Sequence, residues 1–156
     1  MKTAADALRL AIPRLADAGI PDAARDARRL LAHALGIDAG RLTLALRDAL
    51  PEGAADRFEQ AVRARMTRQP VSQITGARSF WGREFRVTPD VLDPRPETEC
   101  LVAAALEAPF SRVLDLGTGS GAILLTLLAE RRQARGTGVD LSQPALEVAA
   151  ANARAL

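Results

Sequence analysis

Hydrophobic and polar positions follow a helical period over the first seventy residues. Leu8, Ile12 and Leu15 recur at spacings of three and four, the pattern of a helix with one buried face. Pro13 lies inside this stripe and predicts a kink or a boundary near it. Similar stripes cover residues 21–36, about 41–46 and about 51–68. The pattern predicts four helices with short connections, which favours an antiparallel bundle.

The periodicity changes at Gln69-Pro70. Residues 80–87 combine aromatic and β-branched side chains, with Gly82 near the turn, which predicts a β-hairpin. After the hairpin, Pro94 and Pro96 hold the chain extended. Pro96 also fits the first turn of a helix. We expect that helix to end near Glu107.

Two short strands follow, each with a helix after it. Residues 112–116 predict a buried strand, and a glycine-rich run connects it to an apolar helix ending near Ala129. Residues 136–140 predict a second strand, and Ser142 fits as the cap of the last helix. This order is typical of a parallel sheet, so the sequence predicts an α/β fold after the helical bundle. The expected parts are residues 1–69, a linker with the hairpin at 70–92, and residues 93–156.

Composition narrows the class of protein. Apolar residues make up 48% and charged residues 26%, the range of soluble globular proteins, which excludes a disordered chain. No apolar run approaches the roughly 20 residues that span a bilayer. Cys100 is the single cysteine, so an internal disulfide is excluded and we expect a cytoplasmic protein. The net charge of +2 is too small to indicate nucleic acid as a partner.

The candidate chemistry lies in the run Asp-Leu-Gly-Thr-Gly-Ser-Gly at 115–121. Its glycines allow a tight turn and let the backbone approach a bound cofactor. Asp140 lies at the end of the second strand, 19 residues after Gly121, where an acid can accept both hydroxyls of a ribose. The pattern therefore predicts a nucleoside site. Its expected residues are Asp115, Gly117, Thr118, Gly119, Ser120, Gly121 and Asp140.

The identity of the nucleoside depends on Asp115. Gly117, Gly119 and Ala122 also satisfy the dinucleotide fingerprint, so the glycines alone leave NAD open. An acid beside the loop can receive the methionine ammonium of S-adenosylmethionine, directly or through water, but would repel a pyrophosphate. Asp115 therefore favours S-adenosylmethionine.

A proline-rich motif makes the pattern more specific. Residues 94–99 read Pro-Arg-Pro-Glu-Thr-Glu and stand sixteen residues before the glycine-rich run. With these motifs the chain resembles the release-factor glutamine methyltransferases of the HemK type over its whole length. Residues 70–76 and 80–87 stand where that family has its linker hairpin. Asp93 replaces a usual aliphatic residue and Gln73 a common aromatic one.

The resemblance implies a fold and an activity. It implies an amino-terminal helical domain that helps bind the substrate, followed by a Rossmann-like class I methyltransferase sheet that is incomplete in this chain. Members transfer a methyl group from S-adenosylmethionine to the glutamine amide in the Gly-Gly-Gln loop of class I peptide chain release factors. Within the resemblance, residues 117–121 hold the methionine part and Asp140 the ribose. It implies no direct nucleic-acid, membrane or metal partner.

The family's catalytic Asn-Pro-Pro-Tyr motif does not occur in residues 1–156. An amide nitrogen is a poor nucleophile, and such a motif aligns it with the methyl–sulfur axis. We therefore assign no catalytic residue and interpret the chain as the amino-terminal part of a longer enzyme. We expect this chain by itself to be inactive.

Three alternatives remain open. A methyltransferase of the same fold could act on another planar nitrogen, such as a ribosomal-protein glutamine or a nucleic-acid base. An NAD-dependent oxidoreductase and a release-factor-binding module without activity are the other two. Among single residues, we interpret His33 as a partly exposed helical residue, Cys100 as a small core residue and Trp81 as packing for the linker.

Overall fold

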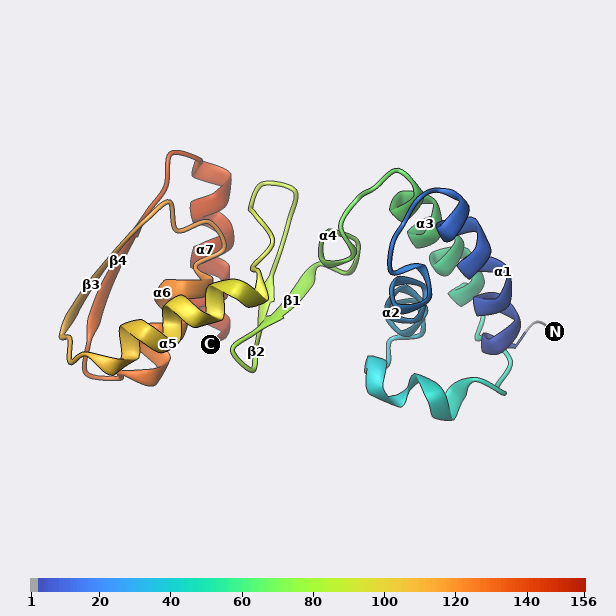
Figure 1. Ribbon diagram of the computed structural model, residues 1–156, viewed down its shortest axis with the longest axis horizontal. Helices are drawn as coiled ribbons and strands as arrows, with labels where there is room; N and C mark the ends of the chain where they lie inside the picture. Colours follow the sequence, from blue (N-terminus) through green and yellow to red (C-terminus); the bar gives the residue numbers. More distant parts are fainter. Residues whose placement is uncertain (1–2) are drawn as a thin grey trace. The chain divides into compact units, whose positions relative to one another are not determined.

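The computed structural model of the chain describes residues 3–156. The chain divides into two compact units, one ending at Thr75 and the other running from Gly76 to Leu156 (Figure 1). The described residues of the first unit form helices and one isolated β-bridge between Thr3 and Ala49, and the second unit combines helices with two pairs of strands. This order confirms the predicted fold class, a helical domain followed by the start of an α/β fold.

The first unit is built from helices of different kinds. Its elements are α1 (Ala4–Asp17), α2 (Ala23–Leu35), the 3-10 helix η1 (Ala39–Ala45), α3 (Ala54–Met66) and α4 (Val71–Thr75). Four of these confirm the four predicted helices, although the third is a 3-10 helix. The sequence pattern does not predict α4, which falls in the expected linker and packs against α2 and α3.

Local signals set the helix ends in this unit. Thr3 accepts a hydrogen bond from the Asp6 amide, and the Asp6 carboxylate accepts one from the Thr3 amide, so α1 begins with a capping box. Pro13 lies inside α1 without ending it, so of the two predicted alternatives, a kink or a boundary, the boundary does not occur there. Gly36, with φ +67°, ends α2 in the left-handed conformation that favours glycine.

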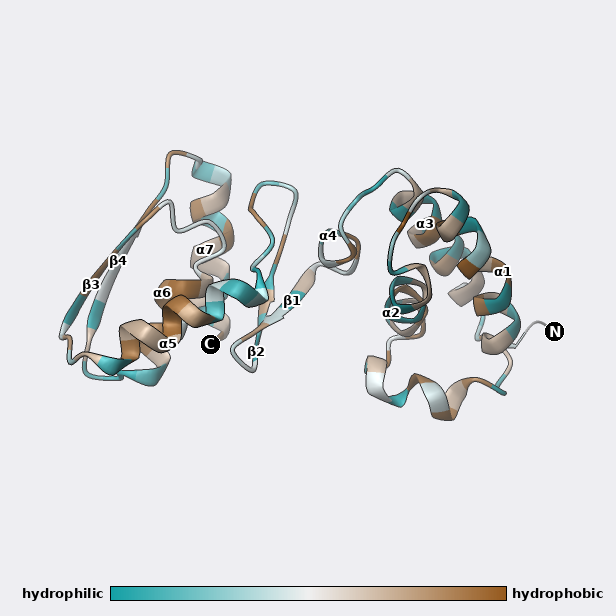
Figure 2. Ribbon diagram, in the orientation of Figure 1, coloured by the Kyte–Doolittle hydropathy of each residue, from teal (hydrophilic) through white to brown (hydrophobic). Residues whose placement is uncertain are grey.

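The core of the first unit lies where the helices face one another. Its largest fully buried side chains are Leu15, Leu30, Leu31, Leu42 and Val62. The charged side chains at its margin are paired: Arg65 Nε donates to Asp26 Oδ2 at 2.8 Å, and Arg14 makes two hydrogen bonds to Glu59. Figure 2 shows the corresponding division, with polar residues on the outer faces of the helices.

The second unit opens with the predicted hairpin. Strands β1 (Ala77–Phe80) and β2 (Arg83–Arg86) pair antiparallel. Trp81 and Gly82 form the turn with φ of 50° and 70°, as a type I′ turn requires. Trp81 is an unusual residue for that conformation. Its main-chain N–H donates a hydrogen bond to Glu99 Oε1 at 2.8 Å. Trp81 packs against a cluster in which Phe80 and Phe85 of the hairpin join Val102, Ala122 and Leu127 from later in the chain, as predicted for a residue that packs the linker.

The rest of the second unit alternates helices and strands. After the short 3-10 helix η2 (Pro96–Thr98) come α5 (Glu99–Glu107), β3 (Arg112–Leu116), α6 (Ala122–Glu130), β4 (Arg135–Val139) and α7 (Gln143–Ala155). Strands β3 and β4 are parallel neighbours, with Leu114 opposite Thr137. Pro96 in the first turn and Ser142 as the cap of α7 are both confirmed.

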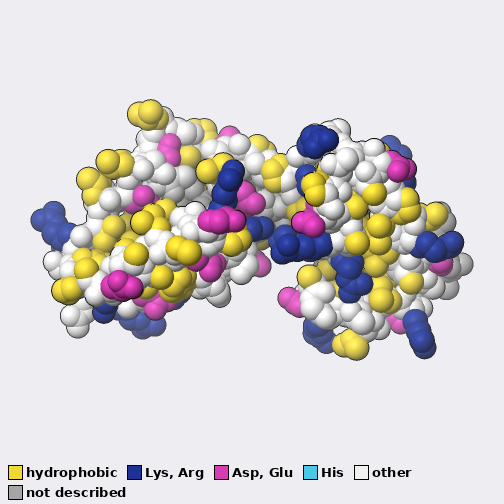
Figure 3. Space-filling view, viewed as in Figure 1, with side chains coloured by type: hydrophobic (Ala, Val, Ile, Leu, Met, Phe, Trp, Pro, Cys, Tyr) yellow, Lys and Arg dark blue, Asp and Glu magenta, His cyan; other side chains and the backbone are white. Residues whose placement is uncertain are grey.

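Strand β3 is not buried as predicted. Leu114 is 63% exposed and Leu116 74% exposed, whereas Val113 and Asp115 on the opposite face are half-buried. The reason is that α6 packs on one face of the β3–β4 pair. Exposed apolar side chains gather at this end of the unit in Figure 3.

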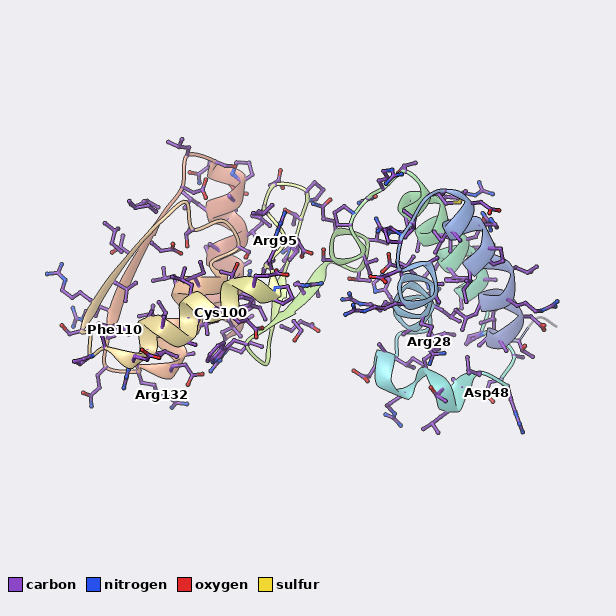
Figure 4. All side chains as sticks on the ribbon, in the orientation of Figure 1. Arg28, Asp48, Arg95, Cys100, Phe110 and Arg132 are labelled. Atoms are coloured by element: carbon purple, nitrogen blue, oxygen red, sulfur yellow. The ribbon has the colours of Figure 1, made fainter. Side chains whose placement is uncertain are left out.

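Cys100 also departs from the prediction. It is exposed on α5, where Figure 4 labels it, rather than a small core residue. Only Val102 is fully buried along this helix, so its packed face is narrow and Cys100 lies outside it. His33 is exposed in the last turn of α2.

Candidate functional site

The glycine-rich run forms the loop between β3 and α6. Gly117, Gly119 and Gly121 have φ of 75°, 54° and 80°, a conformation that side chains with a Cβ rarely adopt. The amides of Gly117 and Thr118 both donate to the carbonyl of Val139 in β4, at 2.8 and 3.0 Å. The loop is therefore fixed to the end of the neighbouring strand.

The three glycines meet different surroundings. A Cβ added to Gly117 would meet no atom within 4 Å, and one on Gly119 would only just reach the Gly117 carbonyl. A Cβ on Gly121 would lie 2.9 Å from Leu125 Cδ1 and 3.4 Å from the Cβ of Ala149 in α7. The first two glycines thus border open space where a ligand can approach the backbone, whereas Gly121 permits close packing against α6 and α7.

Asp140 is the first residue after β4 and lies against this loop. Its Oδ2 accepts from the Gly119 amide and its Oδ1 from the Ser142 amide, both at 2.9 Å. These backbone N–H groups, Ser142 first, lower the pKa of Asp140 below its ordinary value. The carboxylate is therefore ionised at neutral pH, and each oxygen retains capacity to accept a further hydrogen bond.

Asp115 lies at the carboxyl end of β3. Its Oδ2 accepts a hydrogen bond from the Thr118 hydroxyl at 2.8 Å, and the Thr118 side chain is buried. Gly138 in β4 leaves room for that side chain, because a Cβ there would lie 2.8 Å from Thr118 Oγ1. The structure thus brings all the predicted site residues to one edge of the parallel strands, with Asp115 and Asp140 each bound to the loop.

A pocket of about 150 Å³ opens beside the loop and brings the proline-rich motif to it. Pro94, Arg95 and Thr98 line it together with residues 117–120, and Figure 4 shows Arg95 on the segment that leads into α5. Small-molecule sites usually measure roughly 300–1,000 Å³. The pocket formed by these residues is therefore smaller than a typical complete small-molecule site.

Asp93, one of the two residues that depart from the family pattern, also lines this pocket. Its Oδ1 is buried without a hydrogen-bond partner, and its Oδ2 lies 3.9 Å from an Arg78 nitrogen. Such an unsatisfied oxygen costs free energy in the folded state.

Two residues near the site were not singled out from the sequence. Glu99, the last residue of the proline-rich motif, binds the hairpin turn at Trp81. Asn152 is buried in α7 and binds the carbonyl of Ser120. A signal for Asn152 existed, because it follows Ala145 and Val148 at helical spacing and is therefore a polar residue on an apolar stripe.

Comparison with known proteins agrees with this geometry. Residues 6–76 match the family model of the PrmC N-terminal domain, and residues 113–156 match a methyltransferase domain. The release factor glutamine methyltransferase of Cereibacter sphaeroides is 68% identical over 153 residues, 98% of this chain and 55% of that protein. Over nearly its whole length the chain is similar to release factor glutamine methyltransferases.

Other release factor glutamine methyltransferases match at lower identity. The release factor glutamine methyltransferase of Rhodospirillum rubrum is 47% identical over 146 residues, which are 92% of this chain and 45% of that protein. That of Bacillus subtilis is 41% identical over 164 residues, 100% of this chain and 56% of that protein. The chain thus spans about half the length of the curated relatives it matches.

Two further findings concern the described residues. None of the helices formed by residues 3–156 is both long and apolar enough to cross a membrane. In the same part of the chain, His, Cys, Asp and Glu side chains do not gather in threes or more where they could hold a metal ion.

Proposed function

We propose that this chain supplies the cofactor-binding and substrate-recognition parts of an S-adenosylmethionine-dependent methyltransferase. Its substrate is the glutamine side-chain amide in the Gly-Gly-Gln loop of class I peptide chain release factors. The observation that carries the proposal is the binding of Asp140 to the Gly119 amide. That contact occurs in a chain matched over 98% of its length by a release factor glutamine methyltransferase.

The residues of the loop fit S-adenosylmethionine. Gly117 and Gly119 leave open space beside the backbone, which the methionine part would fill. The ionised Asp140 would accept hydrogen bonds from the two ribose hydroxyls. Asp115 would receive the methionine ammonium through the oxygen that Thr118 does not bind. The cofactor supplies an electrophilic methyl group when it is bound.

The reaction also requires binding of the release factor and alignment of its glutamine amide. The helical unit would contact the release factor, as the match of residues 6–76 to an amino-terminal domain of this family supports. Alignment of the amide nitrogen with the methyl group falls to residues outside this chain, since no Asn-Pro dipeptide occurs in it. An enzyme of this kind works where translation takes place, in the cytoplasm.

The alternatives have less support. An NAD-dependent oxidoreductase would place a pyrophosphate next to Asp115, where like charges repel. A methyltransferase for another planar nitrogen would not account for the release-factor name that the three relatives described above carry. A binding module without activity would not need the arrangement of Asp140 and the loop.

Thermal unfolding with added nucleotides tests the cofactor. We define the completed protein as this chain joined to the part of the Cereibacter sphaeroides relative that it does not cover. S-adenosylhomocysteine at 100 times its dissociation constant should stabilise the completed protein by roughly 2.7 kcal/mol, and NAD should not. A rise in Tm with NAD alone would overturn the assignment.

Transfer of a radiolabelled methyl group tests the substrate. The completed protein should label an unmethylated class I release factor, but not a release factor whose Gly-Gly-Gln glutamine is changed to alanine. The 156-residue chain alone should label neither. Label transferred by the chain alone would show that the amide-aligning motif is not required.

A further inference from the structure

Asn152 connects three segments of the second unit through one buried side chain. It lies in α7, is 2% exposed, and makes three hydrogen bonds to main-chain groups. Its partners come from β2, 66 residues earlier, and from the glycine-rich loop, 32 residues earlier. A buried amide with all of these partners satisfied is a specific structural link rather than a filler of the core.

On the hairpin side, Asn152 hydrogen-bonds both main-chain groups of Arg86, the last residue of β2. The Arg86 amide donates to Asn152 Oδ1 at 2.8 Å, and Asn152 Nδ2 donates to the Arg86 carbonyl at 3.1 Å. The side-chain amide thus satisfies both main-chain groups of one strand residue, as a neighbouring strand would.

On the loop side, Asn152 Nδ2 donates to the Ser120 carbonyl at 2.8 Å. Ser120 stands between Gly119 and Gly121, both of which lie in the left-handed region. The close approach of Ala149 to Gly121 shows that α7 packs directly on this part of the loop.

The amide of asparagine is suited to these contacts. They require two donors and one acceptor, and Nδ2 and Oδ1 provide that set. An aspartate of the same shape would keep the acceptor for the Arg86 amide and place an oxygen against two carbonyls. A leucine of the same shape would leave all three main-chain groups unsatisfied.

We infer that Asn152 is a positioning residue for the cofactor loop. By binding Ser120 it holds residues 117–121 in the conformation in which Gly119 meets Asp140, and by binding Arg86 it couples the loop to the linker hairpin. Asn152 acts through the loop and does not itself touch the cofactor. The inference rests on the proposed function, because it assigns the loop to S-adenosylmethionine.

The test compares Asn152→Asp and Asn152→Ala with Val148→Ala in the completed protein. Val148 lies one turn earlier on α7 and packs with Val87 and Val91, so its truncation loosens the same helix without touching the loop. Both Asn152 variants should raise the dissociation constant of S-adenosylhomocysteine at least about fivefold, measured by titration calorimetry well below Tm. Val148→Ala should lower Tm and leave that constant within twofold of wild type.

Two further readouts separate positioning from general stability. The Asn152 variants should raise the KM for S-adenosylmethionine and leave the KM for the release factor unchanged. In the protein without cofactor, the Gly121 and Leu125 amides should exchange with deuterium faster in Asn152→Asp than in Val148→Ala. Equal amide exchange in Asn152→Asp and Val148→Ala would overturn the inference. So would an equal loss of affinity for S-adenosylhomocysteine in Asn152 and Val148 variants whose Tm falls by the same amount.

The exchange measurement also distinguishes the two proposals. If wild type binds no S-adenosylhomocysteine, the proposed function fails. The role of Asn152 in fixing the loop is still decided by exchange, because that experiment contains no cofactor.

Discussion

At the scale of single residues, three carboxylates of the second unit differ in how well they are satisfied. Asp140 accepts from two backbone amides and Asp115 from one hydroxyl. Asp93 has one buried oxygen without a partner. The first two are held in place by hydrogen bonds from the glycine-rich loop, whereas among the described residues Asp93 has a buried Oδ1 without a partner and a single long ion pair, to Arg78. Each difference predicts a different result of substitution.

Asp140→Ala should weaken binding of S-adenosylhomocysteine by about tenfold or more, because charge-assisted hydrogen bonds to both ribose hydroxyls are lost. The far-ultraviolet circular dichroism of the completed protein should stay unchanged. Glu147→Ala, an exposed acid on α7, is the matched control and should bind as wild type does. Calorimetric titration of Asp140→Ala that matches wild type would remove Asp140 from the ribose site.

Asp93→Leu should raise the stability of the chain by about 1 kcal/mol. Leucine has nearly the shape of aspartate and removes the buried, unpaired oxygen, while the ion pair it breaks is long, at 3.9 Å. Asp93→Asn keeps a buried polar atom at the same place and should bring no gain. Urea unfolding decides the matter, and a loss of stability in Asp93→Leu would show that the Arg78 contact outweighs the unpaired oxygen.

At the scale of elements, ion pairs connect helices of the first unit in addition to the packing of their apolar faces. Arg14 in α1 makes two 2.8 Å hydrogen bonds to Glu59 in α3, and Arg63 adds one from the next turn of α3. The guanidinium groups, Arg14 first, lower the pKa of Glu59 from 4.5 to about 2. Glu59 is 38% exposed, so solvent screens much of this interaction.

The Glu59 contact should therefore make the stability of the helical unit depend on pH. Because the folded pKa lies below the unfolded value, the contribution is complete above about pH 4.5 and is lost as pH falls toward 2. Glu59→Gln should cost about 0.5–1 kcal/mol at pH 7 and little near pH 2. Glu52→Gln, at an exposed acid with no ion pair among the described residues, should cost nothing at either pH. Thermal unfolding at several pH values gives the comparison, and a cost of Glu59→Gln that does not shrink with falling pH would contradict it.

At the scale of the whole molecule, the chain contains two units with separate cores. The buried cluster of the first unit runs from Ala4 to Val71, and those of the second begin at Phe80. A unit of this size buries a modest core, so we expect a stability of only a few kcal/mol if it folds by itself.

Residues 1–75 should fold alone as a cooperative helical unit, and residues 1–69 should be less stable. The difference comes from α4, whose Val71 and Ser72 are buried in the first unit. Circular dichroism with thermal unfolding of the two fragments measures it. An unfolded spectrum for residues 1–75 would count against an independent unit, and equal Tm values would show that α4 contributes nothing to it.

The sequence by itself determined the elements and the motif. Apolar spacing placed four helices of the first unit, and Gly19, Pro21, Gly36 and Pro51 gave some of their limits within a few residues. The hairpin followed from its aromatic residues and Gly82, and the glycine-rich run with Asp140 followed from local backbone requirements. These features depend on neighbours along the chain, so they can be deduced from residues in order.

Only the tertiary structure decided which groups meet. The burial of Leu114 and Leu116 depends on what covers each face of β3, which the residues of the strand do not specify. Helix α4 is too short for a periodic signal and is held by packing against α2 and α3. The contact of Asn152 with Ser120 and Arg86 joins segments 32 and 66 residues apart. Such contacts arise from the fold as a whole, because a hydrogen bond between distant segments leaves no pattern in either of them.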